Sequence, residues 1–308
     1  MSSRSTSAGR QKSGAPAEGI AGCAPELRDL TRTRKQLVRE IAQHTLRIQK
    51  VLEDANVKLT GVVSDVLRAS GRAILTALVA GEADPERLVA LTTGRLKAPR
   101  ATLVDALHGR VTAHHRFLLQ LHLTQIDALE AAVRDVEARV GDALAPFRTA
   151  VAHLITMPGI SHTVARVLLA EIRTDMSRFP TAGHLLSWAG LCPRLHESAG
   201  KRLSTRVRPG APWLKTALVQ AAWAAVRTKD SYLRAQFLRL KSRRGPMKAI
   251  VAVAASMLTA AYHMLRDGVP YRELTGAYFD ARDRTKLAKR LIRRLADLGV
   301  HVEIQTAA

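Results

Sequence analysis

A loop rich in glycine and cationic residues is where this sequence could carry covalent chemistry. Ser198 lies between Glu197 and the pair Ala199-Gly200, within the stretch from Leu191 to Pro212. A loop hydroxyl surrounded by cations can attack a phosphodiester, because the cations offset the charge on the phosphate oxygens. The cations of this loop are Lys201, Arg202, Arg206 and Arg208. The alternative is a turn or capping serine without chemistry, and the loop alone leaves both open.

A second candidate contact is the tight turn Pro158-Gly159-Ile160, which Ser161 follows. An apolar helix is predicted just before it, at residues 151–155, and Ser161 is placed to cap the helix that comes next. This order resembles the helix-hairpin-helix of DNA-binding proteins, in which turn amides and a helix N-terminus bind a phosphate. An ordinary corner between two packed helices is the alternative.

Further cations gather about Gly245-Pro246, where one predicted helix ends and another begins. They are Lys241, Arg243, Arg244 and Lys248. Lys215, near the start of a helix predicted at residues 213–226, is a further candidate. We expect these side chains to contact the backbone of DNA or RNA, the alternative being a solvated helix end.

The net charge indicates the class of partner. The chain has 48 Lys and Arg against 26 Asp and Glu, a formal charge of +22, with a sequence pI near 11.1. From Pro193 to the end the count is 23 against 8, so most of the excess lies in the C-terminal third or so. Such an excess is hard to explain for an enzyme of small neutral substrates, whereas a protein that neutralises phosphates needs it. We therefore expect nucleic acid as the partner.

Cysteines and apolar segments bound the remaining classes. Cys23 and Cys192 are too few and too far apart for a disulfide framework or a four-ligand zinc site, which fits a reducing cytosol. The most apolar stretch, residues 249–262, is shorter than a membrane span, and the N-terminus lacks the apolar core of a secretion signal. We expect a soluble, cytoplasmic protein that binds no membrane and, by itself, no metal.

Apolar residues recur at three- and four-residue steps along most of the chain, which predicts a mainly α fold. One stripe predicts a long helix from Pro25 to about Asp54, and another runs from Leu119 to Ala143. Both patterns are typical of coiled-coil arms. The helices predicted elsewhere cover residues 62–79, a segment beginning at Asp84-Pro85-Glu86, and residues 98–107, 182–189, 213–226, 231–241, 247–265 and 286–298.

These patterns divide the chain into four parts. We expect a disordered tail at residues 1–24 and a helical, coiled-coil region at 25–146. A compact helical domain with the helix-hairpin-helix-like turn follows at 147–280, and a basic C-terminal helix and tail at 281–308. Trp213, Trp223 and Tyr232 fall at core-like helical positions, which favours packing over base stacking for these rings.

Several sequence blocks, in a fixed order and spacing, resemble one protein family. They are MPGI..TVARVLLAEI, RFPTAGHLLSWAGLCPRLHESAGKR, WLKTALVQAAWAAVRTKDSYL and the alanine-rich KAIVAVAASML. Together they resemble the C-terminal domain of transposases of the insertion sequence 110/116/902 family. Upstream, LVREIAQHTLRIQKVLEDANVKL resembles the long-helix region of these proteins. The resemblance implies a recombinase whose serine attacks DNA, and Ser198 stands at the matching position.

The same resemblance implies a cofactor and partners. Family members join this domain to a RuvC-like RNase H domain whose Asp-Glu-Asp-Asp set holds Mg²⁺; some use a structured guide RNA, and they assemble as multimers. Before the long helix this sequence offers only 24 residues, with Glu18 as their sole carboxylate. We therefore expect Mg²⁺ only together with a RuvC-like domain that is missing here. The expected assembly is a homo-oligomer or a complex with a full-length transposase.

Two functions remain open. The first is a DNA transposase or site-specific recombinase of a bacterial insertion sequence, nucleoid-associated, in which Ser198 attacks a phosphodiester and which, as a truncated copy, is inactive on its own. The second is a non-catalytic nucleic-acid-binding remnant or regulator. Both use the basic surface, and only the first uses the hydroxyl.

Overall fold

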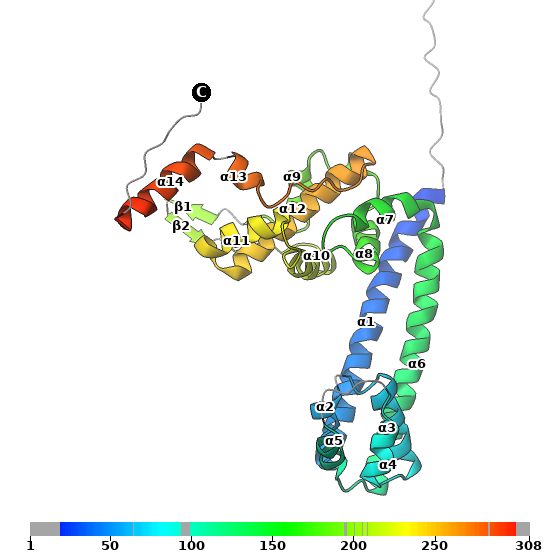
Figure 1. Cartoon of the computed structure of the whole chain (residues 1–308). Coiled ribbons are helices and arrows are strands. Elements are labelled where there is room, and N and C mark those ends of the chain that lie inside the picture. The colour runs from blue at the N-terminus through cyan, green and yellow to red at the C-terminus, as the bar shows by residue number, and fades with distance from the viewer. Residues whose placement is uncertain are drawn as a thin grey trace, which may run out of the picture. The chain divides into compact units, whose positions relative to one another are not determined.

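A computed structural model describes residues 19–63, 65–93, 99–193, 196–199, 201–204, 206–207, 209–282 and 284–299 (Figure 1). The chain divides into two units. One, which we call the arm unit, is Asp29–Asp142; the other, the carboxyl unit, is Met1–Arg28 with Ala143–Ala308. The described residues of both units are mostly helical, which confirms the predicted mainly α fold.

Two long helices, α1 (Gly19–Asp54) and α6 (Ala113–Ala143), lie side by side in opposite directions (Figure 1). Arg34 of α1 pairs with Glu137 of α6 at 2.6 Å, and His44 Nδ1 lies 3.2 Å from His122 Nδ1. The apolar stripes predicted these two helices because they repeat at helical spacing. The predicted tail at 1–24 is wrong for its last six residues, since α1 begins at Gly19, in a segment whose alanines favour a helix.

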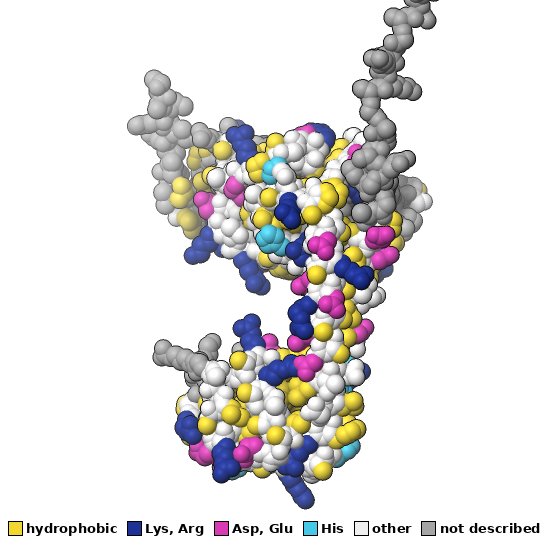
Figure 2. Space-filling view, turned by 90° about the vertical axis from the view of Figure 1, so that its right-hand side faces the viewer, with side chains coloured by type: hydrophobic (Ala, Val, Ile, Leu, Met, Phe, Trp, Pro, Cys, Tyr) yellow, Lys and Arg dark blue, Asp and Glu magenta, His cyan; other side chains and the backbone are white. Residues whose placement is uncertain are grey.

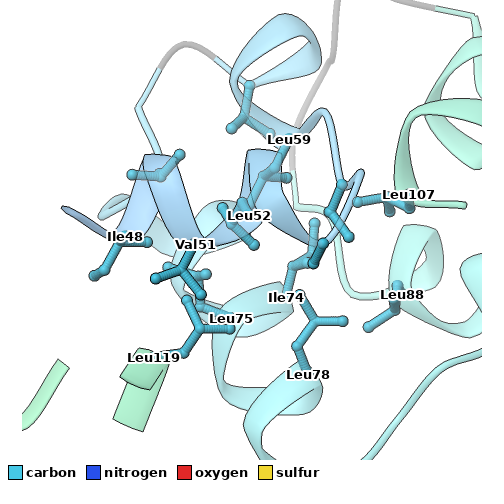
Figure 3. Close-up of a cluster of buried hydrophobic side chains, with 14 of the residues drawn as sticks. Ile48, Val51, Leu52, Leu59, Ile74, Leu75, Leu78, Leu88, Leu107 and Leu119 are labelled. Atoms are coloured by element: carbon cyan, nitrogen blue, oxygen red, sulfur yellow. The ribbon is translucent and has the colours of Figure 1, made fainter. Parts of the chain in front are cut away.

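Four short helices complete the arm unit: α2 (Leu59–Val62), α3 (Ala69–Ala80), α4 (Pro85–Ala90) and α5 (Arg100–Leu107). Together with α1 and α6 they enclose one cluster of buried apolar side chains (Figure 3). Asp84 caps α4 by accepting from the Glu86 amide at 3.0 Å, as the sequence predicted.

The helix predicted at 62–79 is confirmed over 69–79 by α3, but its predicted beginning is wrong, because α2 ends at Val62 and α3 begins only at Ala69. Between them the Asp65 carboxylate accepts from the Leu67 amide at 2.9 Å. This local turn offers the backbone an alternative to a helical hydrogen bond. The turn at Asp65 therefore lies in the non-helical stretch before α3, where the apolar pattern alone predicted helix.

The carboxyl unit is built around α12 (Pro246–Asp267). The helices that pack against α12 are α7 (Arg148–Ile155), α9 (Ala182–Trp188), α10 (Pro212–Ala225) and α11 (Tyr232–Arg244). Helix α8 (His162–Ile172) packs against α7 and α10. The smaller elements are the 3₁₀ turns η1 (Ala145–Phe147) and η2 (Met176–Arg178), the strands β1 (His196–Ser198) and β2 (Lys201–Ser204), and the helices α13 (Tyr278–Arg282) and α14 (Arg284–Asp297).

Among the described helices, α12 is the one long and apolar enough to cross a membrane. Its apolar character is explained by its place in the core. Ile250, Val253 and Leu258 are fully buried among the surrounding helices, and the Tyr262 hydroxyl donates to the Phe179 carbonyl at 3.0 Å. These contacts are those of a core helix in a globular unit, which is hydrophobic because its neighbours cover it.

The His44–His122 contact makes the stability of the arm unit depend on pH. Burial, and then the charges of His44 and Arg47, lower the pKa of His122 from its ordinary value. An unfolded chain takes up this proton near pH 6.5, whereas the folded unit takes it up only at lower pH. We expect the free energy of unfolding to fall as pH drops below about 6.5, until pH has passed through the folded value.

Thermal unfolding at about pH 7.5 and pH 5 measures this effect. The variant His122→Gln should lose less stability than the wild type between the two conditions. His114→Gln, which changes an exposed histidine of the same helix, is the control and should behave as the wild type does. Equal acid sensitivity of His122→Gln and the wild type would contradict the assignment.

Candidate nucleic-acid interface

The loop predicted around Ser198 is a hairpin that leaves the domain at the end of α9. Helix α9 ends with Gly190 in the left-handed region at φ +70°, where the Leu191 amide donates to the Leu186 carbonyl at 3.0 Å. This arrangement ends a helix by satisfying its last carbonyls. Pro193 then pairs with Val207 in an antiparallel bridge, which closes the base of the hairpin. The prediction of an irregular loop is therefore wrong for residues 196–198 and 201–204, which are strands.

Ser198 is the last residue of β1 and stands directly opposite Lys201, the first of β2. The turn between them has two residues, and Ala199 adopts φ +49°. Two-residue hairpin turns require positive φ because only that geometry matches the twist of the strands. Ser198, Ala199 and Lys201 are all exposed. The fold thus presents a hydroxyl and an ammonium-bearing side chain together at the tip of a closed hairpin.

The two strands are out of simple register below the tip. Glu197 pairs with Arg202, but His196 pairs with Ser204, so β2 contains one extra residue. A bulge of this kind bends the strand and increases its twist, and bulges occur often beside active sites because they redirect side chains. The register shift lies within two residues of Ser198, which the sequence singled out.

A glycine fixes the return of the hairpin. A Cβ on Gly210 would lie 2.4 Å from the Gly190 nitrogen and 2.6 Å from the Ala189 carbonyl oxygen, both backbone atoms. Only glycine allows the segment after the hairpin to approach the end of α9 so closely. Since α10 begins at Pro212, this contact ties the hairpin to two core helices at once.

The predicted cations fall into three places. Lys201 and Arg206 are exposed on the hairpin, and Lys215 is half-buried in α10. Arg243 and Arg244 are exposed in the last turn of α11, with Lys248 exposed at the start of α12. We call these last three, with Lys241, the basic corner. The side chain of Arg202 and all of Arg208 lie outside the described residues.

The corner between α7 and α8 has the predicted order of helix, turn and helix. Ser161 caps α8 by accepting from the Val164 amide at 3.3 Å and is exposed, whereas Pro158 is half-buried. Ile160 is only 6% exposed and its amide donates to the Met157 carbonyl at 3.1 Å, so it has no group left for a phosphate. The predicted contact by Ile160 is therefore corrected to a packing role. A phosphate contact at Ser161 stays a prediction.

Gly159 has a packing role as well. It adopts φ +83°, and a Cβ there would lie 2.3 Å from the Ala221 carbonyl oxygen and 2.6 Å from the Ala225 nitrogen of α10. The turn therefore rests on the backbone of α10. Glycine is required at this position both for its conformation and for this approach.

Charge is divided unevenly between the two units. The carboxyl unit has 31 Lys and Arg against 12 Asp and Glu, a net of +19, whereas the arm unit has 17 against 14. Figure 2 shows that Asp and Glu side chains interleave with Lys and Arg along the long helices. A phosphate backbone is attracted by a net excess and not by balanced pairs. Most of the net positive charge of the chain thus lies in the carboxyl unit.

Within the described residues, no group of three or more His, Cys, Asp or Glu side chains is placed to hold a metal ion. Mg²⁺ prefers several oxygen ligands, usually carboxylates and water, in octahedral geometry. The described side chains therefore do not fit Mg²⁺.

Part of this unit is similar to a family of known proteins. Residues 151–238 match the family described as "Transposase IS116/IS110/IS902 family". The carboxyl unit is thus similar to this family over residues 151–238. The matched segment contains the corner before α8, the hairpin with Ser198, α10 and about half of α11.

Three curated relatives align with parts of this chain. An uncharacterized 43.6 kDa protein of insertion element IS110 from Streptomyces coelicolor is 34% identical over 38% of this chain and 29% of its own length. A putative transposase from Sinorhizobium fredii is 30% identical over 40% of this chain and 33% of its own length. The pilin gene-inverting protein of Moraxella bovis is 32% identical over 38% of this chain and 37% of its own length. The chain thus spans about a third of the length of these relatives.

Sequence reasoning missed part of the cationic surface of the carboxyl unit. Helix α11 carries five Lys and Arg in 13 residues and no Asp or Glu. Arg239 in its middle is exposed and was not among the predicted contacts. Its signal was the absence of acidic residues over a whole helix, because solvated helices ordinarily mix both charges.

The close contact of Gly159 with α10 predicts a large loss of stability on substitution. Gly159→Ala should destabilise the carboxyl unit by about 2 kcal/mol or more, since strained backbone and a backbone clash add together. Gly268→Ala is the matched control: Gly268 also has positive φ, at +66°, but open space around its Cβ position. It should cost about 1 kcal/mol. Urea unfolding midpoints measure both, and equal losses would show that the approach to α10 is not tight.

Proposed function

We propose that the carboxyl unit is the DNA-binding domain of an insertion-element transposase and that it holds a phosphodiester against the hydroxyl of Ser198. One observation carries the proposal: an exposed serine stands opposite a lysine at a hairpin tip, in the unit that holds +19 of the formal charge. The family match and the names of the relatives support it, because transposition and gene inversion both rearrange DNA.

The binding step relies on the exposed cations of the hairpin and of the basic corner. Each cation that neutralises a phosphate releases a condensed counterion, so affinity gains entropy and falls as salt rises. Backbone contacts of this kind fix the register of the protein on the duplex and carry no base sequence. The hairpin can therefore bind the DNA backbone without an element that contacts the bases.

The chemical step uses the Ser198 hydroxyl. Its Oγ forms a bond to phosphorus as the bond from phosphorus to one sugar oxygen breaks; the hydroxyl proton leaves to solvent and the departing sugar oxygen takes up a proton. The product is a serine–phosphate diester, which conserves the energy of the DNA bond for rejoining. Lys201 and Arg206 stabilise the charge that develops on the phosphate oxygens.

A second candidate function is binding without cleavage. It is favoured by the lack of a metal-binding carboxylate group among the described residues. In this case the unit occupies DNA or a structured guide RNA through the same cations, and chemistry is supplied by another copy or a full-length transposase in a shared assembly. The two functions differ only in whether Ser198 becomes linked to DNA.

Salt dependence tests the binding step. Replacing Arg243 and Arg244 together by glutamine should reduce affinity for duplex DNA and lower the slope of log affinity against log salt by about 2, one for each lost phosphate contact. Fluorescence anisotropy of a labelled duplex between about 50 and 200 mM NaCl gives the slope.

The control removes two exposed charges from the arm unit. Arg87 and Arg100 are ion-paired there with Glu82 and Glu86, respectively. Arg87→Gln with Arg100→Gln should leave the slope unchanged. An equal effect of the two double variants would contradict a binding surface at the basic corner.

Loss of the hydroxyl tests the chemical step. Ser198→Ala should abolish a covalent protein–DNA adduct on a substrate with a sulfur-substituted scissile bond, while binding stays within about twofold of the wild type. Ser242→Ala, which removes an exposed hydroxyl from the basic helix α11, is the control and should form the adduct normally. An adduct in Ser198→Ala would refute the serine assignment, and no adduct in the wild type would select binding without cleavage.

A further inference from the structure

A pocket of about 380 Å³ lies between α11, α12 and the segment that follows α12. Tyr232 lines it from α11, Ser256, Thr259 and His263 line it from α12, and Tyr271 and Arg272 line it from the following segment. The rest of the wall is apolar, including Leu233, Met264 and Pro270. The hairpin and the basic corner supply none of these residues, so the pocket is a separate feature of the carboxyl unit.

The segment 269–276 is held in place as a fixed wall. The Tyr271 amide donates to Thr156 Oγ1 at 2.8 Å, and the Gly276 amide donates to the Asp230 carbonyl at 3.2 Å. Between these anchors one carboxylate oxygen of Glu273 accepts from the amides of Tyr232, Leu274 and Thr275. A segment without helix or strand is thus pinned at several points, which makes the pocket pre-formed.

The aromatic side of the pocket is pre-organised too. The Tyr232 ring stacks on Phe279 with centroids 5.0 Å apart and an angle of 22°, and the edge of Tyr278 meets it at 5.3 Å. Arg239 lies over the Phe279 ring at 5.4 Å. Because neighbours fix its ring, Tyr232 loses little freedom when a ligand packs against it.

The chemistry of the lining selects the ligand. No Asp or Glu lines the pocket, and the nearby Glu273 carboxylate oxygen is committed to three amides. Burial first, then Glu273 and Tyr232, raise the pKa of Tyr271 to about 12, so its hydroxyl remains neutral at physiological pH. His263 and Arg272 are exposed at the rim. A flat neutral group with polar edges, attached to an anion at the rim, satisfies all of these features.

We propose that this pocket takes one unpaired base of a bound DNA strand, with the phosphate attached to that nucleotide lying at Arg272 and His263. The inference rests on the proposed DNA-binding function and goes beyond it, because the phosphate contacts of the hairpin and the basic corner do not require any base to leave the duplex. Rings and apolar side chains cover the faces of the base, and the hydroxyls of Ser256, Thr259 and Tyr271 meet its edge, which is how an extruded base is read. Ser256 Oγ accepts from Gln236 and keeps its proton to donate, whereas Thr259 Oγ1 donates to the Ala255 carbonyl and is left as an acceptor.

The proposal reverses one expectation. Packing was favoured for Tyr232 over base stacking because the residue falls at a core-like position, yet the structure leaves it half-buried on a pocket wall. Packing against Phe279 and stacking on a base are compatible, since an aromatic ring has two faces.

Binding of three DNA duplexes tests the proposal. They are identical except that one contains a single unpaired adenine, one an abasic residue at that place, and one is fully paired. The wild type should bind the unpaired adenine about tenfold more tightly than the abasic residue, as expected for one stacked base. Ala260→Phe, which fills the pocket from α12, and Tyr271→Leu, which removes a ring, should both abolish this preference and leave affinity for paired DNA unchanged.

The control is Ala224→Phe, at an exposed alanine of α10 outside the pocket, which should keep the preference. Unfolding midpoints establish that each variant is folded. If Ala260→Phe does not fold, the result for Tyr271→Leu decides the test. Wild-type protein that binds all three duplexes equally would overturn the pocket and leave DNA binding standing. Failure to bind any duplex would overturn both. Micromolar binding of dAMP alone would assign the pocket to a free nucleotide and overturn the proposal that it takes a base of a bound DNA strand.

Discussion

Small residues at helix contacts are the constraint on which the carboxyl unit depends. Helix α10 buries alanines at positions 217, 221, 222 and 225, and α12 buries alanines at 249, 254 and 261. Side chains of this size let backbones approach closely, and Gly159 uses that space to rest its turn on α10. The same helix begins two residues after Gly210, which is pressed against the end of α9. The position of the hairpin therefore follows from the packing of the core, which carries an exposed hairpin on a packed scaffold.

The distribution of charge within the unit separates stability from function. Cations in the last turn of α11 are favoured by the helix dipole, so Lys241, Arg243 and Arg244 are consistent with a stabilising role. Lys248 is different, because it lies in the first turn of α12, where the dipole favours an anion. Arg239, in the middle of a helix without acidic residues, gains nothing from either end. Lys248 therefore stands against the local preference of its helix, whereas Arg239 lies over the Phe279 ring.

The elements set by local pattern were predictable, and those set by tertiary contact were not. Apolar periodicity located both long helices and the core helix α12, and capping chemistry located Asp84 and Ser161, because these signals act within a few residues. The hairpin was missed since its strands are three and four residues long and carry no alternating apolar pattern. The burial of Ile160 was missed because it depends on how the corner packs, which no local motif records. The pocket combines residues from position 232 to 274 with an anchor at Thr156, and only folding brings these together.

The contrast between the two units suggests how an encounter with DNA would be ordered. In the arm unit opposite charges are paired, as in Arg34 with Glu137 and Arg72 with Asp127, and its surface exerts little net attraction. The carboxyl unit keeps its excess of +19, so attraction of a duplex is directed to it. At physiological salt this attraction is screened within about 8 Å. Beyond first contact, short-range geometry decides the outcome. In the proposed function, the closed hairpin brings the Ser198 hydroxyl to a phosphate while the neighbouring cations hold the strand.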